Sequence, residues 1–596
     1  MLQRDRNYFS FLTTIVVGTL WALSSTAQTP VPSDAARQGA IQAPQIKPRP
    51  IPDRMVGVDP GNVVRWTLRE AIVSALQGNV DIQLERENVR LAEYDLLGAR
   101  AVYDPSFTSS ITFTPQRFPN TFAFSGTTDT AIITNTLRAD FGMRRLIERT
   151  GGVLDFNFNN SKVTGNRNQL SPQFGPQLGA SFTQPLLRNF KLDLNRRQIL
   201  IAKKQLDLSD ATFRQRAIEI ISRVQAAYWD LAFALRDEEI QREAVRLAET
   251  QLTNNQRQVE VGTLAPIDVV SAATSVESRR IQVFQAMSAV SQAENTLKQL
   301  VVDSPDSTLW QAKITPTESF ELQPMALPLE DALRLARDNR PELKQLALQK
   351  EINATNIDFF RNQAKPQIDF VANYNTNGTG GTPIVAGNVQ PLCSPLTIAG
   401  QPKCVSVVPV DDGRGSFIPG VRITDFGTRQ VVAGDFVGGY GQALRNLFTN
   451  KYHTISFGVN ISIPWKNRLA EANLGRAKQD TRRIDLQTRR QIQDIETQIR
   501  NDIQSIDFAR MRVEAARAAE EFAKQQLSGE EKRFSAGLST TFLVLQRQNE
   551  YSFARGSTIR ALTDYNKLLA QLQRDIGTTL STNNIEVKSD ANGEKK

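Results

Sequence analysis

The chain repeats itself, and this duplication limits the possible fold more than any other feature. Residues 68–113 and 329–374 align without a gap at an offset of 261, so that Pro105 corresponds to Pro366. Both copies have the same order: a helical stretch, a proline, an alternating strand, a long polar loop, a second strand, a second proline and a very long helical stretch. Because a repeat of this length is a structural unit, we expect two similar halves.

The ends of the chain carry signals of their own. Arg4 and Arg6 precede an apolar run, and the small residues up to Ala27 suit cleavage, so residues 1–27 are expected to be an export signal. No later run approaches the roughly 20 apolar residues of a membrane helix, so a membrane span would have to consist of strands. The other expected segments are a Pro-rich flexible lead at 28–65, repeats at 66–326 and 327–579, and a disordered polar tail at 580–596.

Composition argues against several kinds of site. Two cysteines and one histidine are too few for a disulfide scaffold, a zinc cluster or most histidine-dependent catalysis. We therefore predict that the protein is not an enzyme and has no metal or cofactor, and that His453 has a structural or surface role. The net charge of +9 is spread over mixed-sign patterns such as Arg236-Asp237-Glu238-Glu239. Such patterns are typical of solvated helix faces, so no nucleic-acid partner is expected.

Apolar residues spaced by three and four predict two very long helices, one in each copy. The two series are Ile221, Val224, Tyr228, Leu231 and Leu235, and Ile492, Ile495, Ile499, Ile503 and Ile506. At about 1.5 Å per residue, a helix of some 70 residues is on the order of 100 Å long. Such helices have to pack beside others in a bundle or a helical barrel.

Each long helix is expected to end at a glycine and return as an antiparallel hairpin. Gly262 and Gly537 suit the left-handed conformation that ends a helix. Thr263 and Ser539 follow as candidate caps of the returning helices. The two hairpin tips consist of Val261, Gly262, Thr263, Ala536, Gly537, Leu538 and Ser539.

Alternating segments bounded by prolines predict strands with one apolar and one polar face. Proline cannot donate to a sheet but suits a first helical turn, so the prolines are expected at strand–helix junctions. Two strands per copy give four per chain, too few to close a barrel in lipid, whereas a trimer would supply twelve. The junction residues are Pro105, Pro185, Pro366 and Pro464.

The loops between paired strands differ between the copies. Residues 116–177 hold two further strand-like pieces, Leu137–Met143 and Val153–Phe158, which are candidates for an extra hairpin. The other loop contains Cys393 and Cys404. In an exported protein, two nearby loop cysteines either form a local disulfide, which we favour, or stay free thiols.

With these features in place, the chain resembles the TolC-like outer membrane efflux proteins over roughly Trp66 to Thr579. The likeness is carried by LREAIVSALQGN with LEDALRLARDNRPEL, SFTQPLL with NISIPW, and VEVGTLAPIDVVSA with RFSAGLSTTFLVLQRQNEY. The resemblance implies a mainly α-helical fold with membrane strands: a homotrimer with a 12-stranded β-barrel in outer membrane lipid and an α-helical barrel in the periplasm. It further implies a passive duct for tripartite efflux or type I secretion.

The resemblance also implies partners and an entrance. A periplasmic adaptor, working with an inner-membrane transporter, is expected at the hairpin tips, although the tip residues also suit plain helix turns. Family members narrow the entrance with acidic residues beyond the second tip, where this chain has Leu543 and Gln546. The nearby Asp268 of the first copy is either a gate residue or a capping or surface aspartate.

Two rival interpretations explain only part of the pattern. A periplasmic coiled-coil scaffold or adaptor explains the long helices but not the two-faced strands. A stand-alone diffusion porin explains the strands but not the helices. The sequence has no phosphate loop, nucleophile elbow or metal-ligand spacing, which makes an enzyme the least supported class.

Overall fold

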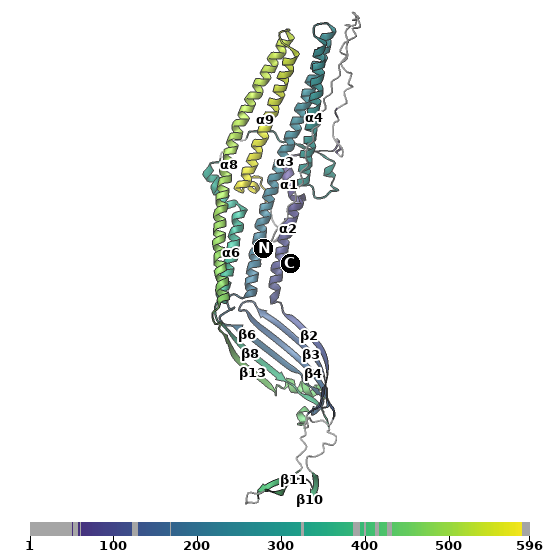
Figure 1. The fold of residues 1–596 in the computed structure, drawn as a ribbon, viewed down its shortest axis with the longest axis vertical. Helices are drawn as coiled ribbons and strands as arrows, with labels where there is room; N and C mark the ends of the chain where they lie inside the picture. Colours follow the sequence, from purple (N-terminus) through teal and green to yellow (C-terminus); the bar gives the residue numbers. More distant parts are fainter. Residues whose placement is uncertain are drawn as a thin grey trace, which may run out of the picture.

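The chain folds into an elongated molecule in which a helical part continues into a curved sheet (Figure 1). The computed structural model describes residues 51, 58–59, 61–121, 129–166, 168–322, 327–384, 394–398, 401–411, 417–425 and 432–586. None of the helices in these ranges combines the length and the apolar character that a membrane crossing requires.

The helices of the two copies correspond closely. The first copy has α1 (Leu68–Gly78), α2 (Val80–Arg100), α3 (Leu194–Glu260) and α4 (Pro266–Val301). The second has α5 (Leu329–Asn339), α6 (Pro341–Gln363), α8 (Arg468–Ser535) and α9 (Thr541–Ile576). The bounds of α1 and α5 differ by the sequence offset of 261, and those of α4 and α9 differ by 275. The predicted pair of long antiparallel hairpins, α3 with α4 and α8 with α9, is confirmed.

Local sequence explains where these helices begin. Thr67 and Glu70 form a capping box at the start of α1, in which each side chain bonds the backbone of the other residue. The Asp193 carboxylate accepts a hydrogen bond from Arg196 N at 2.7 Å and caps α3. Pro266 stands in the first turn of α4, where its missing N–H costs nothing.

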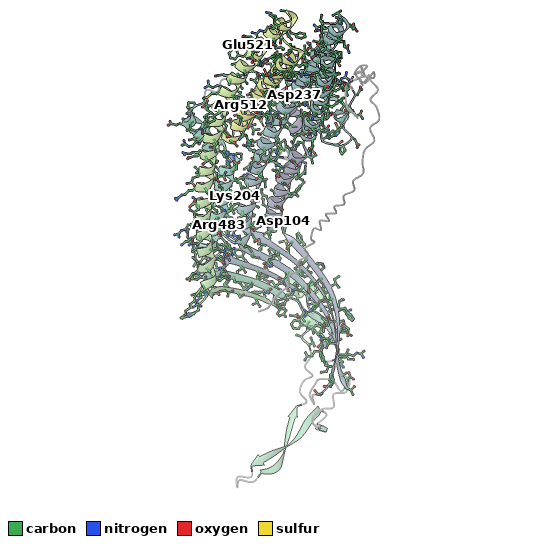
Figure 2. The ribbon with its side chains drawn as sticks, turned by 45° about the horizontal axis from the view of Figure 1, so that its top comes forward. Asp104, Lys204, Asp237, Arg483, Arg512 and Glu521 are labelled. Atoms are coloured by element: carbon green, nitrogen blue, oxygen red, sulfur yellow. The ribbon has the colours of Figure 1, made fainter. Side chains whose placement is uncertain are left out.

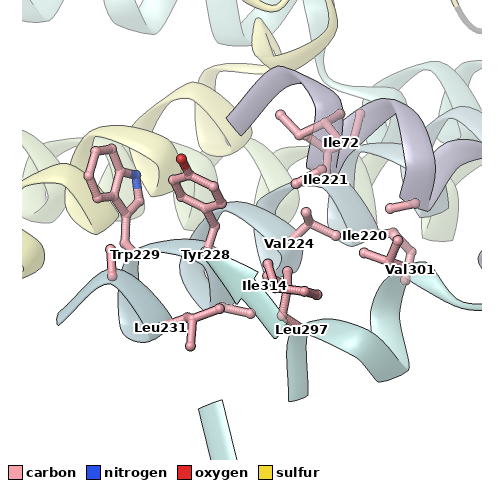
Figure 3. Packing of buried hydrophobic residues seen from close by; sticks show 14 of the residues in the cluster. Ile72, Ile220, Ile221, Val224, Tyr228, Trp229, Leu231, Leu297, Val301 and Ile314 are labelled. Atoms are coloured by element: carbon pink, nitrogen blue, oxygen red, sulfur yellow. The ribbon is translucent and has the colours of Figure 1, made fainter. Parts of the chain in front are cut away.

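The predicted apolar series on α3 forms the first core (Figure 3). Ile221, Val224, Tyr228 and Leu231 are fully buried against α1, α4 and a short parallel sheet of β1 (Val63–Trp66) and β7 (Lys313–Pro316). The Tyr228 hydroxyl donates to Trp66 O at 3.0 Å and accepts from Thr317 N at 3.2 Å, which fixes this sheet on α3. Burial raises the pKa of Tyr228 to about 12. The matching series on α8 forms a second core around Ile499.

The two hairpins are also joined to each other. The guanidinium of Arg555 on α9 lies 2.5 Å from the Glu243 carboxylate on α3, and Arg560 lies over the ring of Phe233 at 5.0 Å. Outside these contacts, the helices carry mixed charges along their length, as Figure 2 shows for Asp237, Arg512 and Glu521. Arg236, Glu239 and Arg512 are exposed, so the predicted solvated faces are present on these helices.

The large sheet has one path of six strands in the order β13-β8-β6-β4-β3-β2, with every neighbouring pair antiparallel. Their bounds are β2 (Ser106–Pro119), β3 (Ala131–Ile147), β4 (Gly152–Gly165), β6 (Gln177–Pro185), β8 (Gln367–Asn377) and β13 (His453–Ser462). Two short strands, β5 (Leu170–Phe174) and β9 (Gly380–Pro383), pair beside this path. A separate sheet contains β10 (Ser394–Ile398), β11 (Gln401–Asp411) and β12 (Phe417–Asp425). The shorter helices are η1 (Ala101–Tyr103), η2 (Thr308–Trp310), η3 (Gly434–Phe436), α7 (Tyr440–Phe448) and α10 (Thr579–Thr582).

The number of strands differs from the prediction. The pieces at Leu137–Met143 and Val153–Phe158 lie within β3 and β4, so the candidate hairpin is confirmed. The expected total of four strands per chain is wrong, because this hairpin enters the sheet between β2 and β6. It fits there because β3 and β4 are as long as β2 and alternate between apolar and polar residues in the same phase.

Both ends of the described chain are more ordered than expected. β1 begins at Val63, inside the predicted flexible lead, and Ile51 packs against the buried cluster of Val245, Val283 and Met287. In the predicted tail, Leu580 and Ile585 pack on the first core. Covering these apolar side chains favours ordering of both segments.

The junction prolines also differ in one respect. Pro105, Pro185 and Pro366 stand at or next to an end of a strand, and Pro464 follows the last residue of β13, Ser462, after Ile463. None occupies the first turn of a long helix, because α3 starts at Leu194 and α8 at Arg468, several residues after Pro185 and Pro464. They terminate strand pairing and do not start helices.

Candidate functional site at the helical tips and in the sheet

The two helical tips have the same hydrogen-bonded turn. Gly262 has a φ of 79° and its N–H donates to Val259 O at 3.0 Å, while Thr263 N donates to Gln258 O at 2.9 Å. In the second tip, Gly537 has a φ of 71° and makes the corresponding bond to Phe534 O at 3.0 Å. These backbone hydrogen bonds around a glycine in the left-handed conformation end both helices, as the sequence predicted.

The predicted caps at the tips are wrong. Thr263 Oγ1 donates back to Gln258 O at 3.0 Å, and Ser539 Oγ donates to Glu530 Oε1, so both hydroxyls bond to the outgoing helices. The returning helices start later, after Ala265 and Thr540, and neither of these has a capping side-chain bond. The longer turns place Thr263 and Ser539 too early to cap.

The tips expose apolar side chains. Val261 is 74% exposed and Leu538 is 79% exposed, and the adjacent Ile267 and Phe542 are exposed as well. A Cβ added at Gly262 or Gly537 would meet no atom within 4 Å, so the surface at both turns is open. Apolar side chains held out on a rigid turn are suited to contact with another protein.

The candidate entrance residues lie just beyond the tips. Asp268 is half-buried in the first turn of α4, and its carbonyl accepts a hydrogen bond from Asn255 Nδ2 at 3.3 Å. Leu543 and Gln546 are exposed on α9. Gln546 Nε2 donates a hydrogen bond to the Glu550 carboxylate at 3.0 Å, one helical turn further along α9. Sequence reasoning did not include Glu550 among the entrance residues. Its position one turn after Gln546 on the same helix face was the signal that could have identified this acidic residue.

The sheet has one apolar and one polar face. A row of directly opposed residues on the apolar face is Phe107, Met143, Phe156, Ala180, Tyr374 and Ile455. The next row, on the polar face, is Thr108, Gly142, Asn157, Gly179, Asn375 and Thr454. Both outermost strands, β2 and β13, are exposed along their length and expose large apolar residues such as Phe113 and Phe457. Such a sheet fits lipid on one side and water on the other.

The ends of the strands nearest the helices carry further exposed apolar groups. Trp465 is 92% exposed directly after Pro464, and Ile463 and Leu187 are exposed nearby. Aromatic residues at this level are typical of the boundary between membrane and water.

His453 is exposed at the start of β13, and its Nδ1 lies 2.8 Å from Asn450 O. Cys393 lies outside the described residues, so its pairing with Cys404 stays a prediction.

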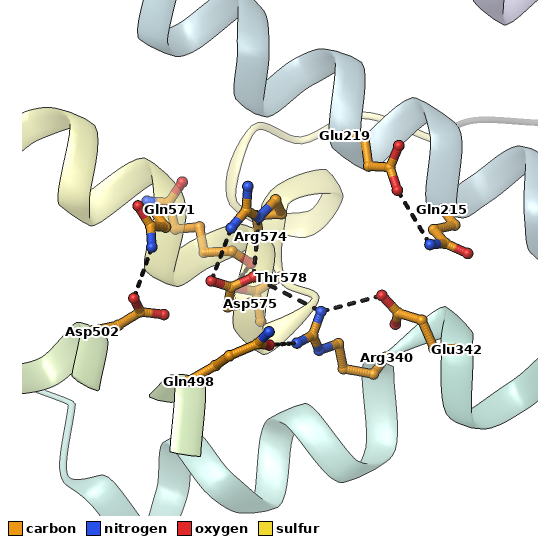
Figure 4. Close-up of polar contacts among 11 residues, drawn as sticks. Gln215, Glu219, Arg340, Glu342, Gln498, Asp502, Gln571, Arg574, Asp575 and Thr578 are labelled. Atoms are coloured by element: carbon orange, nitrogen blue, oxygen red, sulfur yellow. Dashed lines mark hydrogen bonds and ion pairs between the residues drawn. The ribbon is translucent and has the colours of Figure 1, made fainter. Parts of the chain in front are cut away.

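A buried polar cluster lies among the helices of the second copy (Figure 4). Arg340 Nη1 lies 3.8 Å from Asp575 Oδ1, and its Nη2 donates to Gln498 Oε1 at 2.5 Å. Asp502 accepts from Gln571 Nε2 at 2.9 Å. Burial, strengthened by the nearby Asp575 carboxylate, raises the pKa of Asp502 to about 7. Sequence reasoning missed this cluster because single charged residues on helices are common.

Comparison with known proteins gives a consistent result. A model of the outer membrane efflux protein family matches residues 152–301 and 410–578, which make up more than half of the chain. No curated protein matches the chain. A solved membrane protein from Pseudomonas aeruginosa has 16% sequence identity and a TM-score of 0.57, with 90% of this chain and 97% of that chain covered.

Two further solved structures share the fold at similarly low identity. The CmeC outer membrane channel of Campylobacter jejuni has 14% identity and a TM-score of 0.56, covering 86% of each chain. The outer membrane protein VceC of Vibrio cholerae has 14% identity and a TM-score of 0.55, covering 86% of this chain and 96% of that chain. With the two-faced sheet and the long hairpins, the family match leads to one conclusion: this chain belongs to the outer membrane efflux proteins, a family of channels in the bacterial outer membrane whose helical portion lies in the periplasm.

Proposed function

We propose that the protein is the outer membrane duct of a tripartite efflux or type I secretion system. Three chains would join their sheets into one closed barrel, and their helical hairpins would form a helical barrel in the periplasm. Substrates delivered by a periplasmic adaptor and an inner-membrane transporter would pass through passively. The observation that carries this proposal is the fusion of a two-faced sheet with open edges to helices on the order of 100 Å long.

The proposal includes the processing and division of the chain. Residues 1–27 would be removed on export, and the efflux repeats would span 66–326 and 327–579, with β1 added to the first. The helix offsets of 261 and 275 support two repeats.

The tips are the proposed adaptor contact, and changing one exposed residue tests this role. Leu538→Asp should lower dye export from living cells on the order of tenfold, because a carboxylate in an apolar contact loses its hydration without gaining a partner. The purified variant should keep the trimer and the channel conductance of the parent in planar bilayers. Leu538 is preferable to Gly537 as a target, since its backbone is not in the left-handed region.

The control and the contrary outcomes are distinct. Leu538→Met keeps an apolar tip and should export like the parent. Unchanged export by Leu538→Asp would remove this tip from the adaptor contact. Absence of conductance from a parent protein that is soluble without detergent would instead support the scaffold, and a large, steadily open conductance would support a porin.

The entrance is proposed to lie beside the tips. Asp268 from each of the three chains would form an acidic ring, and Leu543 and Gln546 would narrow the opening. A ring of carboxylates favours cations in a pore. Asp268→Asn should therefore lower the preference for potassium over chloride in bilayer recordings. Asp230→Asn, which alters an aspartate paired with Lys567 at 2.8 Å far from the tips, is the matched control. Equal selectivity of Asp268→Asn and the parent would exclude Asp268 from the entrance.

A further inference from the structure

The hairpin of β3 and β4 occupies the middle of the large sheet and does not lie at its edge. β3 pairs with β2 from Ser106 opposite Arg144 to Pro119 opposite Ala131. On the other side, β4 pairs with β6 from Val153 opposite Thr183 to Asn159 opposite Gln177. β2 and β6, the strands predicted to belong to the repeated pattern, therefore have no contact as neighbours in the sheet.

The hairpin follows the division of the sheet into two faces. Its apolar-face residues Met143 and Phe156 continue the row that begins at Phe107 and ends at Ile455. On its polar face, Arg144 Nε lies 3.6 Å from Asp155 Oδ1 in the neighbouring strand. A hairpin outside the membrane wall would have no need for an apolar face in phase with the other strands.

The hairpin makes specific contacts with α3 and β6. At its turn, Arg196 Nη1 of α3 donates to Arg149 O at 3.1 Å, and Gln184 Nε2 of β6 donates to Thr150 O at 3.0 Å. Further along, a Cβ on Gly179 of β6 would lie 2.3 Å from Asn157 Oδ1 of β4. Glycine at this position lets β4 and β6 approach with the asparagine between them.

We propose that each chain contributes six strands to the membrane barrel, so that the trimer closes an 18-stranded barrel and not a 12-stranded one. This rests on the proposed function, which supplies the trimer. Six is an even number of antiparallel strands, so β2 of one chain meets β13 of the next in antiparallel orientation and the ring closes without a mismatch. The occupants of the two open edges are thus the two neighbouring chains, one pairing its β13 with β2 and the other pairing its β2 with β13.

The additional strands change the opening at the cell surface. Barrel diameter grows roughly in proportion to strand number, so 18 strands make an opening about 1.5 times as wide as 12. Barrels of 16 to 18 strands enclose a water-filled channel. The polar face, with Asn157, Asn375 and Thr454 in one row, lines this lumen.

Single cysteines on two matched pairs of positions test the strand number. The background is the full chain with Cys393→Ser and Cys404→Ser, reconstituted in phospholipid vesicles and labelled with a small fluorophore. Phe156→Cys and Asn157→Cys report on the hairpin. Ile455→Cys and Thr454→Cys report on β13 in the same two rows. A nitroxide on lipid chains and aqueous iodide are the two quenchers, and native mass spectrometry counts the chains.

The expected result is three chains, with lipid nitroxide quenching the labels at Phe156 and Ile455 by the same factor and iodide quenching those at Asn157 and Thr454. Lipid quenching at Ile455 but not at Phe156 would overturn the 18-stranded barrel and leave the proposed duct intact. Loss of lipid quenching at both positions, in folded protein, would overturn the duct and the barrel together.

Discussion

Asp502 is a buried acidic residue on α8 whose pKa is raised well above its ordinary value. It is 5% exposed, and its Oδ2 has no hydrogen-bond partner within the described chain. A proton on this oxygen would let it donate to the nearby Asp575. Because burial raises its pKa from 3.8 to about 7, the folded state binds this proton more tightly than the unfolded state does. The stability from Asp502 is therefore present at low pH and is lost as the pH rises from about 4 to about 7.

Asp502→Asn should remove this loss, because an amide keeps a donor toward Asp575 and an acceptor for Gln571 without titrating. At pH 8 the variant should be more stable than the parent by up to about 4 kcal/mol, since the rise of the pKa from 3.8 to about 7 is roughly three times the one unit that corresponds to about 1.36 kcal/mol. Urea unfolding in detergent between pH 5 and 8, followed by circular dichroism, measures the difference. Asp507→Asn, exposed on the same helix, is the control. Parallel pH profiles for Asp502→Asn and the parent would contradict this account.

At the scale of elements, the helices were predictable and the sheet only in part. The apolar series on α3 and α8 and the glycines at both tips determine the hairpins locally, so spacing alone identified them. The partner of a strand depends on residues far away in the chain. Alternation showed that Val153–Phe158 would be extended, but not that it would separate β2 from β6.

The candidate sites show the same limit. Gly262 and Gly537 could be identified because their conformation is a local property of the turn. The caps at Thr263 and Ser539 were mistaken, since the exact starts of α4 and α9 depend on the length of the turn. The Arg340 cluster could not be predicted, because Arg340 lies between α5 and α6, its partners lie on α6, α8 and α9, and they meet only in the folded chain.

At the scale of the whole molecule, the proposed ring depends on pairing between the open sheet edges of neighbouring chains. Within one chain, β2 and β13 lie at opposite edges of the path with four strands between them. At about 4.8 Å per strand, they are on the order of 24 Å apart along the sheet. A disulfide requires Cα atoms within about 7 Å, so a bond between these strands can form only between two chains.

A cysteine scan of the two edges therefore tests closure of the ring. With Ile111→Cys on β2, one of Phe457→Cys, Val459→Cys or Ile461→Cys on β13 should form a disulfide on oxidation, because all four positions share the apolar face. A closed ring gives a covalent trimer on a denaturing gel, and reduction returns it to single chains. Gly458→Cys is the control, since its position lies on the polar face of the sheet and should not react with Ile111→Cys. Covalent dimers without trimers, or no cross-link from any of the three pairs, would contradict a closed barrel of three chains.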